Sequence, residues 1–249
     1  MVPVALAAAW FGSPYLPALV ALAGAGMGWE WARLSRLRSP VAVVLIVLGP
    51  LVAACAMAFE KDAAAWLLAM IFAAGVALAE KDPRLRAWGA GATLWIALPC
   101  VALLWLDRGA GGRERILYLF AVVWASDIGA YAFGRLLGGP KLAPALSPNK
   151  TWAGAVGGLV CAMLVGGVIA AAMTAEPAAI LLGFSAFVAI AAQLGDLAES
   201  FAKRRFNVKD SGGVIPGHGG LLDRLDSLLA AALALAAALA VATTGGTPS

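Results

Sequence analysis

Apolar residues fill this chain in long runs that are separated by short polar segments. An α-helix needs about 20 apolar residues to cross a bilayer core. The runs predict eight membrane-spanning helices, with approximate bounds 3–27, 40–59, 63–79, 87–106, 116–137, 153–174, 178–200 and 219–243. Within the first run, "FGSPYLP" (11–17) holds two prolines and a glycine, which predict a kinked helix or two short ones. The expected total is therefore seven to nine.

The amino-acid composition also indicates a membrane protein. Hydrophobic residues make up 62% of 249 and charged residues 13%, whereas an ordinary soluble domain has about 25% charged residues. No polar stretch is long enough to fold as a separate domain. We therefore expect an all-α, polytopic integral membrane protein with one membrane domain over 1–249. Residues 1–115 supply N-terminal helices of less defined role, and residues 116–249 carry the candidate chemistry.

The net charge of +4 is small and lies in loops, which indicates membrane orientation rather than nucleic-acid binding. Lysines and arginines gather in alternate loops, at Arg33, Arg36 and Arg38; at Lys81, Arg84 and Arg86; at Lys141 and Lys150; and at Lys203, Arg204, Arg205 and Lys209. The positive-inside rule places these loops in the cytoplasm. The loop "DRGAGGRER" (107–115) departs from the rule with three arginines. A basic surface for anionic lipid is an alternative use of the same charge.

Polar residues concentrate in two segments, 126–151 and 196–226. Ionisable groups at membrane depth usually face a protein interior or a water-filled cavity and mark function. The orientation above brings both segments to the same side. We therefore expect a polar active-site cavity that opens to the cytoplasmic side.

The second segment is rich in carboxylates. Asp223 and Asp226 are three residues apart and share one face of the last predicted helix with Ser227. The end of the preceding helix carries a similar face, formed by Asp196, Glu199, Ser200 and Lys203. Carboxylates beside hydroxyls suit Mg²⁺, which commonly binds through one or two carboxylates plus substrate phosphates. The alternative is ion pairs alone, of Asp223 with Arg224 or of Asp196 with Lys203.

The loop between these helices, "KRRFNVKDSGGVIPGHGG" (203–220), combines four cations with five glycines. Lysine and arginine bind phosphate oxygens, and glycines let main-chain N–H groups come close. A helix that begins near 219–222 would add a positive dipole end. A positive-inside anchor with turn glycines is the alternative. His218 is the sole histidine, and loop structure or a phosphate hydrogen bond suits it better than base catalysis, because phosphoryl transfer depends mainly on positioning and cations.

The first segment has a similar make-up. Asp127 lies within "VVWASDIGAYAFG" (122–134), and the loop that follows carries Lys141, Ser147, Asn149, Lys150 and Thr151. These side chains suit phosphate. A proton or ion relay at Asp127 is one alternative, and another is a helix start at "SPNKTWAG" capped by Ser or Asn. The following "GAVGGLVCAMLVGG" (154–167) predicts close helix packing through small residues.

The segment "SFAKRRFNVKDSGGVIPGHGGLLDRLD" (200–226) closely resembles the signature of phosphatidate cytidylyltransferases, also called CDP-diacylglycerol synthases. The matching positions are Ser200, Lys203, Arg204, Lys209, Asp210, Gly212, Pro216, His218, Gly219, Gly220, Asp223, Arg224 and Asp226. "GDLAES" (195–200) and the segment 124–154 are also similar, so the resemblance covers about the C-terminal half. One position departs from the pattern: Ala153 stands where the family usually has Glu or Gln, which leaves the role of that position open.

The resemblance implies an enzyme of the bacterial cell membrane that condenses CTP with phosphatidic acid to give CDP-diacylglycerol and pyrophosphate. It implies Mg²⁺, as one or two ions, and a homodimer, with no nucleic acid as partner. The implied metal ligands are Asp196 and Asp223, followed by Asp127 and Asp226. The implied catalytic residues are Asp223, Asp196, Lys203, Arg204, Lys209 and Asp210, and the implied substrate-binding residues are Lys150, Ser147, Asn149, Thr151, Ser200, His218, Gly219, Gly220 and Arg224.

Other functions remain open at this point. A polyprenol-type kinase, or a cytidylyltransferase with a different lipid acceptor, would use the same kind of CTP site. An ion-coupled transporter would also place carboxylates in membrane helices, but it would not need a loop rich in glycine and lysine.

Overall fold

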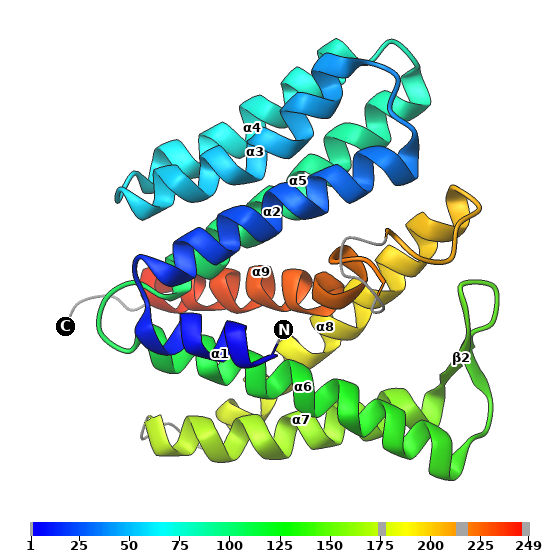
Figure 1. Cartoon of the computed structure of the whole chain (residues 1–249). Coiled ribbons are helices and arrows are strands. Elements are labelled where there is room, and N and C mark those ends of the chain that lie inside the picture. Colours follow the sequence, from blue (N-terminus) through cyan, green and yellow to red (C-terminus); the bar gives the residue numbers. More distant parts are fainter. Residues whose placement is uncertain (1, 174–177, 213–218, 246–249) are drawn as a thin grey trace. The chain divides into compact units, whose positions relative to one another are not determined.

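The computed structural model describes residues 2–173, 178–212 and 219–245. The helices in this part of the chain are α1 (Val2–Phe11), α2 (Tyr15–Ser35), α3 (Pro40–Ala58), α4 (Asp62–Ala79), α5 (Pro83–Leu106), α6 (Gly112–Leu137), α7 (Trp152–Met173), α8 (Ala178–Arg205) and α9 (Leu222–Gly245), as labelled in Figure 1. Among the described residues, seven helices, α3 to α9, are long and apolar enough to cross a membrane. The prediction of an all-α, polytopic membrane protein is confirmed.

The first predicted span, 3–27, is divided into two helices, which is one of the two outcomes predicted from "FGSPYLP" (11–17). The helix breaks after Phe11 because Gly12 adopts φ +64°, a left-handed conformation that glycine tolerates. Helix α1 has 10 residues and is too short to cross a bilayer. Helix α2 continues to Ser35, beyond the predicted end, and carries the charged residues Glu30 and Arg33 among its apolar ones.

The chain divides into two compact units. The first comprises Met1–Arg113 and Arg205–Leu225, and the second comprises Glu114–Arg204 and Asp226–Ser249. The segment 205–225 thus belongs with the N-terminal helices, although it lies close to the C-terminus in the sequence. Each unit is described separately below.

In the first unit, helices α2, α3, α4 and α5 pack against one another, as their ribbons in Figure 1 show. Small residues allow the close approach. A Cβ atom on Gly24 would lie 2.7 Å from the Cβ of Pro50, and one on Gly49 would lie 2.9 Å from the Cβ of Phe72. Packing through small residues is typical of helices in membranes.

Glu80 joins two loops of the first unit. Its buried carboxylate accepts hydrogen bonds from the main-chain N–H groups of Arg38 (2.9 Å) and Ser39 (3.1 Å), before α3, and of Lys81 (2.9 Å) and Asp82 (3.3 Å), before α5. Burial alone would raise the pKa of Glu80, but these four hydrogen bonds outweigh it and hold the pKa below its ordinary value of 4.5.

Replacing Glu80 by Gln should lower the free energy of unfolding by about 1–3 kcal/mol at neutral pH, because one charged acceptor oxygen is lost. A depressed carboxyl pKa stabilises the fold above the ordinary glutamate value and loses that effect as the pH falls through the folded-state value. The Tm difference between wild type and Glu80→Gln should therefore shrink below pH 4.5. Thermal unfolding in detergent at several pH values measures this Tm difference. A Tm difference that grows in acid would contradict the stabilising role of the ionised Glu80 carboxylate.

In the second unit, α6, α7, α8 and α9 approach one another through small residues. A Cβ on Gly129 would lie 2.8 Å from Cys161 on α7, and one on Gly166 would lie 2.6 Å from the Ser185 hydroxyl on α8. The predicted packing role of the glycine-rich segment 154–167 is confirmed by these contacts. The Tyr118 and Ser185 hydroxyls also form a buried hydrogen bond (2.9 Å) between α6 and α8.

The predicted loop after α6 is a hairpin. Strands β1 (Lys141–Ala143) and β2 (Ser147–Thr151) pair antiparallel, with Lys141 opposite Thr151. The α7 helix start is capped by Thr151, whose hydroxyl accepts a hydrogen bond from Gly154 N (3.1 Å). The expectation that Ser or Asn caps this helix is therefore wrong, because Ser147 and Asn149 lie within the strand β2.

Candidate active site

Three carboxylates of the second unit lie close enough to interact electrostatically: Asp127 of α6, Asp196 of α8 and Asp226 of α9. Gly195 makes this possible, because a Cβ there would lie 2.6 Å from the main-chain oxygen of Asp226. Asp226 is 7% exposed, Asp196 is partly exposed and Asp127 is exposed. Three like charges in one place repel one another unless cations compensate them.

Lysines provide this compensation. Lys150 Nζ of β2 lies 2.5 Å from Asp196 Oδ2, and Lys203 Nζ lies 3.2 Å from Glu199 Oε2 within α8. The alternative pairing of Asp196 with Lys203 is therefore wrong. Within the second unit, the Lys150 ion pair joins the first polar segment, 126–151, to Asp196 at the beginning of the second.

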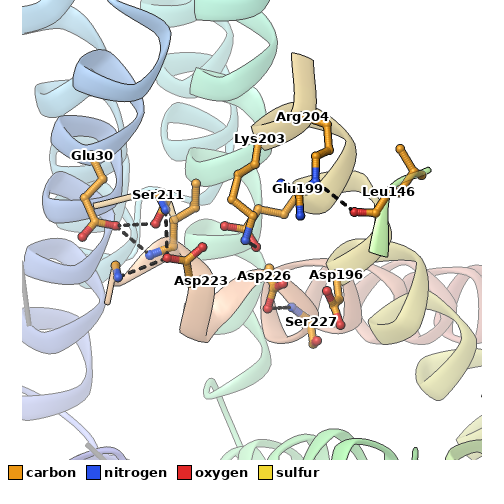
Figure 2. Close-up of polar contacts among 12 residues, drawn as sticks. Glu30, Leu146, Asp196, Glu199, Lys203, Arg204, Ser211, Asp223, Asp226 and Ser227 are labelled. Carbon is orange, nitrogen blue, oxygen red and sulfur yellow. Dashed lines mark hydrogen bonds and ion pairs between the residues drawn. The ribbon is translucent and has the colours of Figure 1, made fainter. Parts of the chain in front are cut away.

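The end of α8 is also attached to the hairpin. Arg204 Nε donates a hydrogen bond to the main-chain oxygen of Leu146 (3.2 Å), in the turn between the strands, as Figure 2 shows. The Arg204 side chain remains exposed. Arg204, predicted as a phosphate ligand, thus also holds the hairpin at the end of α8.

In the first unit, Asp223 lies in the first turn of α9. Its Oδ2 accepts hydrogen bonds from Ser211 N (2.9 Å) and Gly220 N (3.1 Å) (Figure 2). Helix α9 begins at Leu222, so the predicted helix start near 219–222 is confirmed.

The first amides of α9 are bound by another carboxylate, that of Glu30 on α2. Leu221 N donates to Oε1 (2.8 Å) and Leu222 N donates to Oε2 (2.9 Å), and the Ser211 hydroxyl is 3.3 Å from Oε2. The sequence suggested that this helix end faces substrate phosphate. In the structure, protein carboxylates accept the hydrogen bonds of Gly220, Leu221 and Leu222.

The remaining predicted site residues lie on both units. Lys209, Asp210 and Arg224 are exposed in the first unit, and Gly219 adopts φ +83°. In the second unit Ser200 and Ser147 are partly exposed and Asn149 is exposed, whereas Thr151 is buried as a helix cap. His218 lies outside the described residues.

Two acidic residues received no individual role from the sequence: Glu30, which was not singled out, and Glu199, which was only placed on the acidic face with Asp196. Glu30 is 1% exposed and Glu199 is 3% exposed, and the Glu199 side chain lies within hydrogen-bonding reach of Asp226. Glu30 had a recognisable signal, because a lone acidic residue in an apolar helix is costly unless it has a specific partner. Its partners could not be identified, because they lie about 180 to 190 positions later in the sequence.

The donor set of the second unit suits a hard divalent cation. Asp127, Asp196 and Asp226 offer carboxylate oxygens, which Mg²⁺ prefers, and Lys150 already supplies positive charge to Asp196. Across the described residues, the structure places no three acidic, histidine or cysteine side chains around a single ion position. The carboxylates therefore match Mg²⁺ in donor type, but the described residues do not form a ready-made set of three ligands.

Comparison with known proteins identifies the family. A sequence model described as the cytidylyltransferase family matches residues 1–242. The chain belongs to this family. It is similar to proteins named phosphatidate cytidylyltransferase. That of Brucella suis biovar 1 (strain 1330) is 39% identical over 235 residues, which cover 91% of this chain and 84% of the relative.

Shorter matches are more similar. The phosphatidate cytidylyltransferase of Staphylococcus saprophyticus is 50% identical over 119 residues, 47% of this chain and 46% of the relative. That of Staphylococcus aureus (strain COL) is 44% identical over 128 residues, 51% of this chain and 49% of the relative. The family resemblance expected from the signature segment is thereby confirmed.

Proposed function

We propose that this protein transfers the cytidylyl group of CTP to phosphatidic acid and produces CDP-diacylglycerol and pyrophosphate for phospholipid biosynthesis. The observation that carries the proposal is its similarity to phosphatidate cytidylyltransferases over 91% of the chain. The structure supports it with carboxylates and lysines at the ends of apolar helices. An anionic lipid with two acyl chains needs such cations beside apolar surface.

The reaction is a substitution at phosphorus. An oxygen of the phosphatidate phosphate forms a bond to the α-phosphorus of CTP, and the bond from that phosphorus to the oxygen bridging to the β-phosphate breaks. Pyrophosphate leaves with the electron pair. The nucleophile is already anionic near neutral pH, so the residues have to position and neutralise charge rather than remove a proton.

We assign the basic residues to the phosphates. In the second unit these are Lys150, Lys203 and Arg204, and in the first unit they are Lys209 and Arg224. Ser200 and His218 support them. Lys150 and Lys203 already bind carboxylates, so they are held in place before a substrate arrives.

We assign Mg²⁺ to the carboxylates. In the second unit Asp196 leads, with Asp127 and Asp226, and in the first unit Asp223 is the proposed ligand. When bound, Mg²⁺ supplies positive charge to the phosphate oxygens. Asp210, exposed between α8 and α9, completes the proposed acidic set.

We also propose that the site faces the cytoplasm of a bacterial cell and that the protein is a homodimer. CTP is a cytosolic nucleotide, and the loops that carry the basic clusters would then obey the positive-inside rule. The homodimer is carried over from the family resemblance alone.

An assay of the purified protein in detergent with CTP, Mg²⁺ and phosphatidate tests the activity. The proposal expects equal amounts of pyrophosphate and CDP-lipid. Release of CDP with a newly phosphorylated lipid would instead indicate a kinase. CDP-lipid formation with a polyprenyl phosphate, but not with phosphatidate, would change the acceptor. Absence of any CTP turnover would count against an enzyme.

A further inference from the structure

We propose that Glu30 of α2 is a positioning residue for the reaction, which fixes the chain around Asp223 through the start of α9. This inference rests on the proposed function, in which Asp223 acts at the site. It gives the N-terminal helices a part in catalysis. Glu30 lies in the half of the chain where the signature segments are absent.

The contacts of Glu30 lead directly to Asp223. Both oxygens of the buried Glu30 carboxylate accept main-chain hydrogen bonds, from Leu221 N at 2.8 Å and Leu222 N at 2.9 Å. Ser211 links the two acids, because its hydroxyl bonds Glu30 and its main-chain N–H donates to Asp223. Glu30 and Asp223 therefore hold the two ends of the segment 211–223 together (Figure 2).

A carboxylate is well suited to this place. The first amides of a helix have no partners within the helix, and negative charge is favourable at a helix N-terminus. A buried carboxylate is in turn costly unless it is hydrogen-bonded. Glu30 and the start of α9 therefore stabilise each other.

The surrounding chain is fitted closely to Glu30. A Cβ on Gly212 would lie 3.0 Å from the Glu30 carboxyl, and a Cβ on Gly220 would lie 2.9 Å from Glu30 Oε2. Both positions therefore have little room for a side chain. The sequence indicated the glycines of this loop for phosphate binding. In the structure, Gly212 and Gly220 allow the main chain to approach Glu30 closely.

The chain just before this segment, at Arg205 and Phe206, is attached to α2 and α5 by further contacts. The Phe206 ring packs on Trp31 of α2 (6.2 Å between centroids) and on Trp88 of α5 (5.4 Å). The Arg84 side chain donates a hydrogen bond to the main-chain oxygen of Arg205 (3.2 Å). Helices α2 and α5 thus hold the chain before Lys209 and Asp210, and Glu30 holds it before Asp223.

The test compares Glu30→Gln with Glu80→Gln. Both glutamates are buried in the first unit and accept main-chain hydrogen bonds from loop residues, but only Glu30 contacts the segment that carries Asp223. Glutamine keeps the size and loses one acceptor and the charge. Two readouts are needed: hydrogen exchange of amides 220–222 in the protein without substrate, and kcat, KM and Mg²⁺ dependence in the CTP assay.

Glu30→Gln should expose amides 220–222 to exchange and lower kcat by about 10- to 100-fold, the usual range for residues that orient a metal ligand. It should raise the Mg²⁺ concentration needed for half activity and change the KM for phosphatidate little. Glu80→Gln should lower Tm without either effect. Unchanged exchange in Glu30→Gln would overturn the anchoring, and faster exchange with unchanged kcat and Mg²⁺ dependence would overturn the positioning role.

Ser211→Ala is the milder variant if Glu30→Gln does not fold. It removes one donor from Glu30 and leaves both carboxylates in place. Exchange and kcat should shift in the same direction as for Glu30→Gln, but less, and wild-type values of both would overturn the proposal. Because exchange is measured without CTP, absence of turnover in the wild-type protein would refute the proposed function and still leave the anchoring tested.

Discussion

Replacing Asp223 by asparagine should abolish CTP turnover and leave membrane insertion and folding intact. Asparagine keeps an acceptor oxygen for Ser211 N and Gly220 N, both of which donate to Oδ2 of Asp223. It loses the negative charge that would bind a cation. A loss of about 4 kcal/mol in transition-state stabilisation, within what a metal ion supplies, would lower kcat by roughly 10³-fold.

Asp82→Asn is the matched control for this variant. Asp82 also lies at a helix start and accepts hydrogen bonds from two main-chain N–H groups, those of Arg84 (2.9 Å) and Leu85 (3.3 Å). Both variants should insert and unfold similarly, and only Asp223→Asn should lose pyrophosphate release. Activity near the wild-type level in Asp223→Asn, at any Mg²⁺ concentration, would remove Asp223 from the metal site.

Much of the fold follows from local patterns. Apolar runs of the length of a bilayer predict the membrane helices, and the prolines and glycine at 11–17 mark the break that separates α1 from α2. The start of α9 at Leu222 was predicted within a few residues. These features depend on neighbours in the sequence, so their physical causes can be recognised without a structure.

The hairpin shows the limit of such patterns. Residues 141–151 contain two prolines and no alternation of apolar and polar residues, so nothing local predicts strands. The pairing is short, and it is supported from outside by the Lys150 ion pair with Asp196 and by the Arg204 hydrogen bond to Leu146. Both supports come from α8, about 50 residues later in the chain.

Glu30 shows even more clearly that local sequence patterns do not identify every residue of the candidate site. The acidic and basic residues of the signature segment could be selected from the sequence, because they cluster there. A buried carboxylate on α2 that binds the main chain of Leu221 and Leu222 has no local signal for its partners. Its partners are main-chain N–H groups, which every residue except proline carries, so only the three-dimensional structure identifies the contact.

Gly220 lies close to Glu30, Ser211 and Asp223. Gly220→Ala should therefore lower both the stability and the turnover of the protein. A Cβ at this position would lie 2.9 Å from Asp223 Oδ2 and 2.9 Å from Glu30 Oε2, and it would overlap the Ser211 hydroxyl. The methyl group cannot fit unless the Ser211 hydroxyl moves away and both carboxylates shift, so the hydrogen bonds of both acids are disturbed together. Overpacking of this kind costs about 1–3 kcal/mol of stability.

Gly220→Ala should lower turnover more than stability, because one of the displaced groups, the Asp223 carboxylate, is proposed to bind the cation. We expect a loss of about 100-fold in kcat, at the upper end for a disturbed ligand orientation, together with a measurable fall in Tm. Gly91→Ala on α5 is the control, since a Cβ there meets no atom within 4 Å, and it should keep wild-type kcat and Tm. Equal kcat in both variants would mean that the close packing of Glu30, Ser211 and Asp223 is not needed for turnover.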